Sequence, residues 1–244
     1  MTANEFEQSA QEVREEGCTL LKGVLPKEIV RACHDAFLPL LAATIRNHSD
    51  KPNRGSARHF ITLPVRPPFA DPVIHENDTV LKVVEQLLGD DPTIGSYATD
   101  TPLNGSVHQN IHADLPNLFP ESKLILPMHV ATVNFSLVNV TSNMGPFEIA
   151  RKTHLLPKDE ALQKIESGEI TLEPLLLNVG DVLVRNPYCL HRGTPNRTDT
   201  PRPVAVITYV RPWYRFIYNR IPKSEFERMS DRGKQLWRLI PQDE

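Results

Sequence analysis

The feature that most constrains the fold is a series of short β-like runs in the second part of the chain, separated by proline-containing turns. Proline has no N–H to donate to a neighbouring strand, so it is tolerated mainly at turns and strand edges. With 22 prolines against 11 glycines, the chain favours many short strands with stiff connections. The expected strands are residues 94–99, 124–126, 130–140, 147–150, 171–177, 181–185 and 204–211. This number of strands predicts an antiparallel sandwich or barrel.

The first 90 residues favour helices instead. Apolar side chains recur with the spacing of a helix that buries one face, and glycine or proline stands near the expected ends. The expected elements are a helix that ends at Gly17, a short strand at residues 18–21, a helix after Pro26 that Pro39 kinks, and a helix at residues 78–88. The apolar stripe of the helix after Pro26 predicts that one of its faces is buried.

Residues 47–71 are polar, basic and rich in proline, which is typical of a long surface loop. Long loops often close over a substrate. The basic side chains of Arg54, Arg58, His59 and Arg66 could meet an anionic substrate there. A lid is therefore one interpretation of this segment, and a solvated basic loop is the other.

Composition narrows the class of protein. The chain has 244 residues, of which 40% are hydrophobic and 23% charged, as in ordinary globular proteins. We expect one domain over residues 1–244, with a helical part at about 1–90 and a strand core at about 91–218. The net charge of −3 argues against nucleic acid as the main partner.

Other features bear on location. No apolar run reaches the roughly 20 residues that a membrane span needs, and the acidic start lacks the apolar core of a signal peptide. The three cysteines, Cys18, Cys33 and Cys189, are far apart and form no paired motif. Neither a disulfide framework nor a thiolate zinc site is expected. We expect no membrane partner and a cytoplasmic location.

Two histidines are followed, two residues later, by an aspartate. On extended backbone such side chains project from one face, so both can reach the same metal ion. His48 and Asp50 lie in the polar segment without a strand beside them, which favours a solvated turn. His112 and Asp114 stand where a strand could lead into a loop. That context is compatible with a rigid metal site.

A catalytic Fe(II) site needs a third ligand, because it uses two imidazoles and one carboxylate on one face and leaves the other face open. His191 follows the expected strand at residues 181–185 and a turn, and it is the best candidate. Arg202, eleven residues later, opens another expected strand. Its guanidinium could grip a carboxylate with two parallel hydrogen bonds, which lysine could not reproduce.

These segments resemble, in order, the phytanoyl-CoA dioxygenase family of Fe(II)/2-oxoglutarate-dependent oxygenases. The similar stretches are residues 17–25, residues 105–114 with Gln109, the Asn143-Met144-Gly145-Pro146-Phe147 stretch followed by His154, and residues 180–202 with His191, Asn196 and Arg202. The resemblance covers about residues 17–212, and the last stretch is its most specific part. Phe147 stands where many members have a threonine that helps to hold 2-oxoglutarate.

The resemblance implies a mainly β fold, a double-stranded β-helix (cupin-type jelly roll) with buttressing N-terminal helices. It implies that His112, Asp114 and His191 bind iron and that Arg202 binds the distal carboxylate of 2-oxoglutarate. Gln109 is a further candidate for the co-substrate, with an ordinary capping amide as the alternative. Asn134 or Ser136 could supply the polar contact that Phe147 cannot. His154 is expected to be structural, and Cys189 to be a small core residue.

The implied activity is oxidation, by default hydroxylation, of an unactivated C–H bond in a small-molecule metabolite, with O2 consumed and succinate and CO2 released. Two alternatives remain from other classes. One is a cupin-like binding protein without turnover, and the other is a redox-neutral cupin enzyme that uses Zn or Mn. Neither alternative calls for an arginine placed to bind a dicarboxylate.

Overall fold

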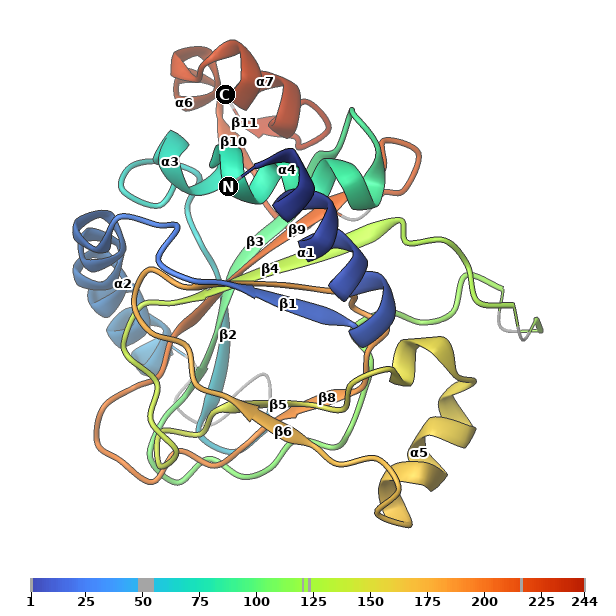
Figure 1. Ribbon diagram of the computed structural model, residues 1–244. Helices are drawn as coiled ribbons and strands as arrows, with labels where there is room; N and C mark the ends of the chain where they lie inside the picture. The colour runs from blue at the N-terminus through green and yellow to red at the C-terminus, as the bar shows by residue number, and fades with distance from the viewer. Residues whose placement is uncertain (1, 48–54, 120, 123, 216, 244) are drawn as a thin grey trace.

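The computed structural model describes residues 2–47, 55–119, 121–122, 124–215 and 217–243. Two antiparallel β-sheets face each other, and helices lie on the outside (Figure 1). The large sheet has the order β1 (Cys18–Leu21), β7 (Val182–Arg185), β4 (Val130–Ser136), β9 (Val204–Val210), β3 (Thr93–Pro102) and β2 (Arg58–Thr62). The small sheet has the order β6 (Glu173–Leu175), β5 (Phe147–Ile149) and β8 (His191–Gly193). This is the expected jelly-roll architecture, without a closed barrel among the residues described.

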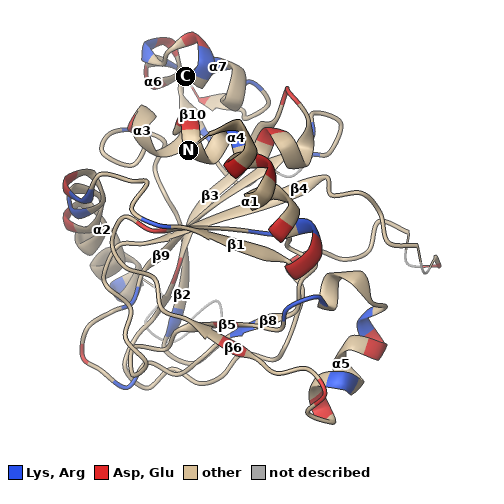
Figure 2. Cartoon of the chain, viewed as in Figure 1, with Lys and Arg blue, Asp and Glu red and all other residues tan. Residues whose placement is uncertain are grey.

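Helices cover the outer face of the large sheet. In Figure 1, α1 and α4 lie side by side over it, α2 flanks it, and α5 lies beside the small sheet. The helices are α1 (Ala3–Glu16), α2 (Lys27–Asn47), α3 (Pro72–His75), α4 (Asp78–Leu88), η1 (Thr153–Leu155), α5 (Lys158–Glu166), α6 (Lys223–Arg228) and α7 (Asp231–Trp237). Two short strands, β10 (Ile221–Pro222) and β11 (Gln242–Asp243), pair near α6 and α7. Lysine, arginine and acidic residues gather mainly on these outer helices, and the central strands are largely uncharged (Figure 2).

The alternation of side chains along β4 explains how the sheet divides the interior. All seven residues of β4 are buried. Ala131, Val133 and Phe135 belong to the main apolar core. Thr132 and Asn134 point the other way, because successive strand residues face opposite sides, and they line a cavity. One face of the strand thus stabilises the fold, and the other supplies polar groups to a site.

The three long helices expected in the first 90 residues are confirmed, including Pro39 inside α2 and the end of α1 at Gly17 in the left-handed conformation. The loop expected at residues 47–71 is wrong in part: Arg58–Thr62 is strand β2, paired with β3. The strand expected at residues 124–126 is also absent; the side chains of Leu124 and Ile125 are largely exposed. His48, Asp50 and Arg54 lie outside the described residues.

None of the helices in the described part of the chain is long and apolar enough to cross a membrane. All three cysteines are buried and unpaired, in agreement with the sequence. Cys189 packs in a small apolar cluster with Ile149 and Leu183, as expected for a core residue.

Candidate metal and co-substrate site

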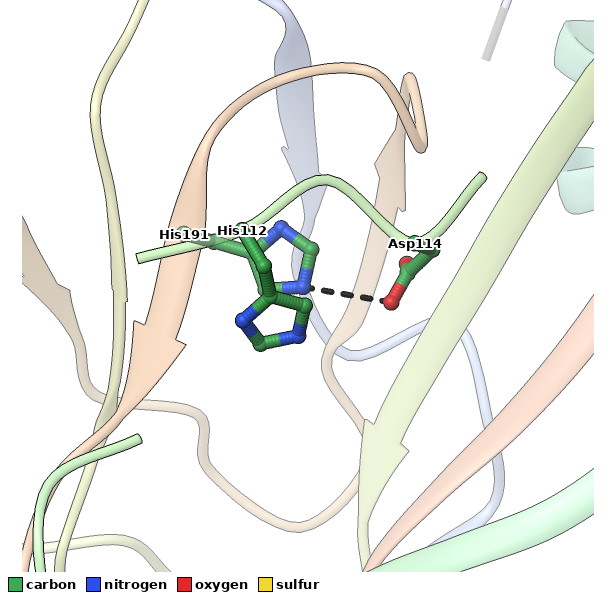
Figure 3. Close-up of side chains that lie close together, drawn as sticks. All are labelled: His112, Asp114 and His191. Atoms are coloured by element: carbon green, nitrogen blue, oxygen red, sulfur yellow. Dashed lines mark ion pairs between the residues drawn. The ribbon is translucent and has the colours of Figure 1, made fainter. Parts of the chain in front are cut away.

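His112, Asp114 and His191 meet at one end of the small sheet. One ligand atom of each lies within 4.8 Å of the other two, and the three side chains point toward one another (Figure 3). Backbone pairing places them: the N–H groups of His112 and His191 each donate to the other residue's carbonyl, at 3.0 and 2.9 Å. The N–H of Asp114 donates to the carbonyl of Pro187 at 2.9 Å. The predicted triad is therefore brought together by residues far apart in sequence.

Both imidazoles have the tautomer that a metal site needs. Nδ1 of His112 lies 2.7 Å from the carbonyl oxygen of Asn110, and Nδ1 of His191 lies 2.9 Å from that of Cys189. A carbonyl can only accept, so each Nδ1 carries a proton, and the neutral form of each ring then has its lone pair at Nε2. Burial and the neighbouring His191 lower the pKa of His112, which favours the neutral, metal-binding form.

Asp114 is held as a carboxylate by Arg185. Its Oδ2 lies 2.6 Å from Nη2 of Arg185, and its Oδ1 lies 3.3 Å from Nε2 of His191. Burial by itself raises the pKa of Asp114, but the charge of Arg185 outweighs it and holds this pKa well below its usual range. Two imidazoles and one carboxylate are a donor set that fits a divalent metal ion.

Arg185 was not singled out from the sequence. It ends strand β7, its side chain is buried, and its Nε donates to Oδ1 of Asn134 at 3.0 Å. Its guanidinium also lies 5.1 Å from the centre of the Phe147 ring, within the range of a cation–π contact. The sequence signal that could have identified Arg185 is a charged residue at the end of the otherwise apolar strand Val182–Arg185.

A cavity of about 280 Å³ opens beside the triad. Besides the three candidate ligands, its lining includes Asp100, Gln109, Asn134, Phe147, Arg185 and Arg202. Apolar side chains such as Leu183 and Val206 complete the wall. A mostly apolar cavity with a few convergent polar groups is typical of a small-molecule site.

Arg202 lines this cavity and is 2% exposed. Its Nη2 donates to the carbonyl of Gly145 at 2.6 Å, whereas its Nε is buried without a hydrogen-bond partner. Burial lowers the pKa of Arg202 to about 10, an effect that nearby Asp100 opposes. A buried guanidinium with an unsatisfied donor beside a cavity fits a carboxylate ligand.

The weaker candidates have identifiable contacts. Oε1 of Gln109 accepts from the N–H of Gly193 at 2.8 Å, so this amide caps a strand while it lines the cavity. Asn134 orients Arg185, and Oγ of Ser136 lies 3.4 Å from the carbonyl of Pro203. Nε2 of His154 donates to the carbonyl of Arg14 at 2.9 Å, which matches the structural role expected of it.

Two facing sheets that enclose two imidazoles, one carboxylate and a buried arginine define the chain as a cupin-type jelly roll with a candidate metal centre. The sequence model of the family described as phytanoyl-CoA dioxygenase (PhyH) matches residues 13–204, and the chain belongs to this family. It is therefore a member of the non-haem Fe(II)/2-oxoglutarate-dependent dioxygenases, as the sequence resemblance implied.

Solved structures show the same fold at low sequence identity. The non-haem, α-ketoglutarate-dependent epimerase SnoN from nogalamycin biosynthesis is 18% identical with a TM-score of 0.62, over 86% of this chain and 82% of its own. HygX from Streptomyces hygroscopicus, solved with nickel, 2-oxoglutarate and hygromycin B, is 15% identical with a TM-score of 0.63, over 88% and 90%. The carbocyclase SnoK from nogalamycin biosynthesis is 14% identical with a TM-score of 0.63, over 94% and 93%.

Proposed function

We propose that this protein is an Fe(II)- and 2-oxoglutarate-dependent oxygenase that hydroxylates an unactivated C–H bond of a small-molecule metabolite, with release of succinate and CO2. The observation that carries the proposal is that one cavity is lined both by the triad and by the buried guanidinium of Arg202. Family membership supports the same class. We also propose that the chain works as a single domain and in the cytoplasm.

Each side chain has a distinct task in this proposal. Nε2 of His112, Nε2 of His191 and Oδ1 of Asp114 hold the iron, and Arg202 binds the distal carboxylate of 2-oxoglutarate. Bound iron and 2-oxoglutarate, together with O2, supply an oxidant able to abstract hydrogen from an unactivated C–H bond. The chain's own share is orientation and the exclusion of water. Phe147, whose ring centre lies 4.9 Å from that of His191, shields one side of the triad.

A second cavity, of about 420 Å³, lies next to the one that the triad lines. The two share Ala113 and Leu115, and apolar side chains such as Met128 and Leu156 form part of the wall of the second. We propose that the body of the substrate occupies this space. The related structures include one solved with hygromycin B and another, SnoN, with nogalamycin RO, which supports a small molecule as the substrate class.

Hydroxylation is the outcome we propose for this chain, although the same fold carries other outcomes. Two of the related structures are described as an epimerase and a carbocyclase. Because the same metal and co-substrate ligands could serve all of these outcomes, only the product of the reaction distinguishes hydroxylation from the others. A gain of one oxygen atom in the product, measured by mass spectrometry with 18O2, supports hydroxylation. A loss of two hydrogen atoms or an unchanged mass contradicts it.

The class itself is tested without a substrate. Fe(II) and 2-oxoglutarate are added to the purified protein under anaerobic conditions, and we expect a visible charge-transfer band from the chelate. The His191→Ala variant is the matched control and should give no band. Neither a binding protein nor a redox-neutral Zn or Mn enzyme predicts this band, so its absence from the wild-type protein overturns the proposal. A substrate screen read by succinate formation above background then follows.

A further inference from the structure

Asp100 lies between two buried guanidinium groups. Nη1 of Arg58 donates to Oδ2 of Asp100 at 2.8 Å, and Nη2 of Arg202 lies 3.8 Å from the same oxygen. Arg58 and Arg202 are only 1% and 2% exposed. Asp100 therefore forms a direct ion pair with Arg58 and only a long contact with Arg202.

Arg58 is fixed in place by its surroundings. Its Nη2 donates to the carbonyl of Thr194 at 2.8 Å. Its guanidinium fills the space over Gly193, where an added Cβ would collide with Nη1 of Arg58 and would lie 2.7 Å from Oε1 of Gln109. Strand β2, which carries Arg58, pairs with β3, which carries Asp100. The guanidinium is thus anchored by backbone, packing and strand pairing together.

The location of Asp100 matters because it lines the same cavity as Arg202. If Arg202 binds the distal carboxylate of 2-oxoglutarate, two carboxylates compete for one guanidinium and repel each other at low effective dielectric constant. The pair with Arg58 offsets the charge of Asp100. Two guanidinium groups and one carboxylate leave a net charge of about +1, which one further carboxylate would neutralise.

We propose that Arg58 is a positioning residue for the co-substrate: it holds Asp100 away from Arg202, so that Arg202 remains able to bind a carboxylate. The inference rests on the proposed function and goes beyond it, because it assigns a role to two residues outside the metal triad. It differs from both interpretations of the segment that holds Arg58, a lid and a solvated basic loop. In this arrangement Arg58 acts through Asp100 and does not touch the co-substrate.

A double-mutant cycle separates this indirect role from a direct one. Binding of 2-oxoglutarate is measured by calorimetry on Mn(II)-loaded protein without turnover, for wild type, Arg58→Gln, Asp100→Asn and the double variant. We expect Arg58→Gln to weaken binding by about tenfold or more and Asp100→Asn to strengthen it by about threefold or more. The double variant should bind within about threefold of Asp100→Asn, because the group that Arg58 restrains is no longer charged.

Equal weakening by Arg58→Gln in both backgrounds overturns the inference, since Arg58 would then act directly. Unchanged or weaker binding by Asp100→Asn also overturns it, and this outcome decides the matter even if Arg58→Gln fails to fold. Arg151→Gln is the matched control: it removes another arginine–carboxylate pair, 2.9 Å from Glu173, and should leave 2-oxoglutarate binding unchanged. If wild-type protein binds Mn(II) but no 2-oxoglutarate, the proposed function fails instead.

Discussion

At the scale of single residues, Asp114 differs from the two histidines of the triad because it has a buried charged partner. Removing either imidazole loses its packing and the hydrogen bond from Nδ1 to a backbone carbonyl, but it leaves no charge without a partner. Removing the carboxylate leaves Arg185, whose side chain is 4% exposed, without its ion pair. A buried charge without a partner is strongly unfavourable.

We therefore expect His112→Ala, His191→Ala and Asp114→Ala all to lose metal retention, but only Asp114→Ala to lose substantial stability as well, by about 1–3 kcal/mol. Metal content after dialysis and urea unfolding of the metal-free proteins measure the two effects. Asp114→Asn keeps an acceptor for Arg185 and should recover part of the stability. Full metal retention in any alanine variant removes that residue from the site.

Arg202→Ala should weaken 2-oxoglutarate binding and leave metal affinity nearly unchanged. The physical reason is that a fully desolvated carboxylate loses its partner, at a cost on the order of 3–5 kcal/mol. Calorimetric titration of 2-oxoglutarate into metal-loaded protein measures the loss. Unchanged affinity would move the anchor to Arg192 or Arg197.

The residues that could be predicted are those marked by local spacing. His112, Asp114, His191 and Arg202 stand in motifs readable along the chain. Arg185 meets Asn134 across 51 positions of sequence, and Arg58 meets Asp100 across 42. Such pairs depend on strand pairing, which no local pattern specifies, so they could not be predicted.

At the scale of elements, the turn before β5 supports Arg202 through Gly145. Gly145 has a φ of +74°, which non-glycine residues rarely adopt. An added Cβ would lie 2.6 Å from the carbonyl oxygen of Thr194, a backbone atom that cannot move aside alone. The carbonyl of Gly145 also accepts from Arg202, so a substitution that shifts this turn also shifts a group that holds the candidate anchor.

Gly145→Ala should reduce stability by about 1–3 kcal/mol and weaken 2-oxoglutarate binding, because the turn that holds Arg202 must shift. Gly168→Ala is the control: its φ is +79°, but nothing lies within 4 Å of the added Cβ, so it carries the conformational penalty without the collision. Denaturant unfolding and 2-oxoglutarate titration measure both variants. Equal effects from the two substitutions would show that the collision is unimportant.

Glu76 joins two helical elements at the C-terminal side of the molecule. Its Oε1 lies 3.4 Å from Nε2 of His75, and its Oε2 accepts from Oγ of Ser230, the N-cap of α7, at 2.6 Å. The neighbouring His75 and Ser230 lower the pKa of Glu76 below its ordinary value of 4.5, although burial opposes them. The carboxylate therefore helps to hold α7 against α3.

A carboxyl whose pKa is lower in the folded state contributes stability above its unfolded pKa and loses it as pH falls through the folded value. We expect Glu76→Gln to melt at a lower temperature than wild type at pH 7, with the difference shrinking below about pH 4.5. Melting curves of both proteins from pH 7 to pH 3 measure this. A difference that is constant with pH would mean that the charge of Glu76 is unimportant.

Two element predictions failed for physical reasons. The polar, basic and proline-rich composition around Arg58–Thr62 predicts a loop. Its arginine is nevertheless buried, since Asp100 and the carbonyl of Thr194 satisfy it. Residues 124–126 were assigned to a strand on hydrophobicity alone, yet Leu124 is 78% exposed. Apolar composition without a partner strand does not make a strand.

At the scale of the whole molecule, the number of short strands predicts an antiparallel sandwich or barrel, and the family resemblance implies the jelly roll in particular. The strand order β1-β7-β4-β9-β3-β2 could not be predicted from the sequence. It places β1, an expected strand, and β2, from the segment expected to be a loop, at the two edges of the large sheet. Long-range pairing of this kind is decided by the complete core and not by any one segment.

The two facing sheets also divide the site between them. His191 belongs to β8 of the small sheet and His112 pairs with it, whereas Arg202 lies two residues before β9 of the large sheet. On the proposed assignments, a metal ion alone would contact mainly residues of the small sheet, and 2-oxoglutarate alone would contact mainly Arg202 beside the large one. With both bound, the chelate would cross the gap and connect the sheets.

The binding of the two ligands should therefore be thermodynamically coupled. By reciprocity, metal ion and 2-oxoglutarate each raise the affinity of the other by the same factor, and ligands that bind only the folded state raise its melting temperature. We expect the increase with Mn(II) and 2-oxoglutarate together to exceed the sum of the two separate increases, measured by scanning calorimetry. In Arg202→Ala the excess should vanish, while the increase with Mn(II) alone remains. The two sheets would then be connected through the site only when the metal ion and 2-oxoglutarate are both bound.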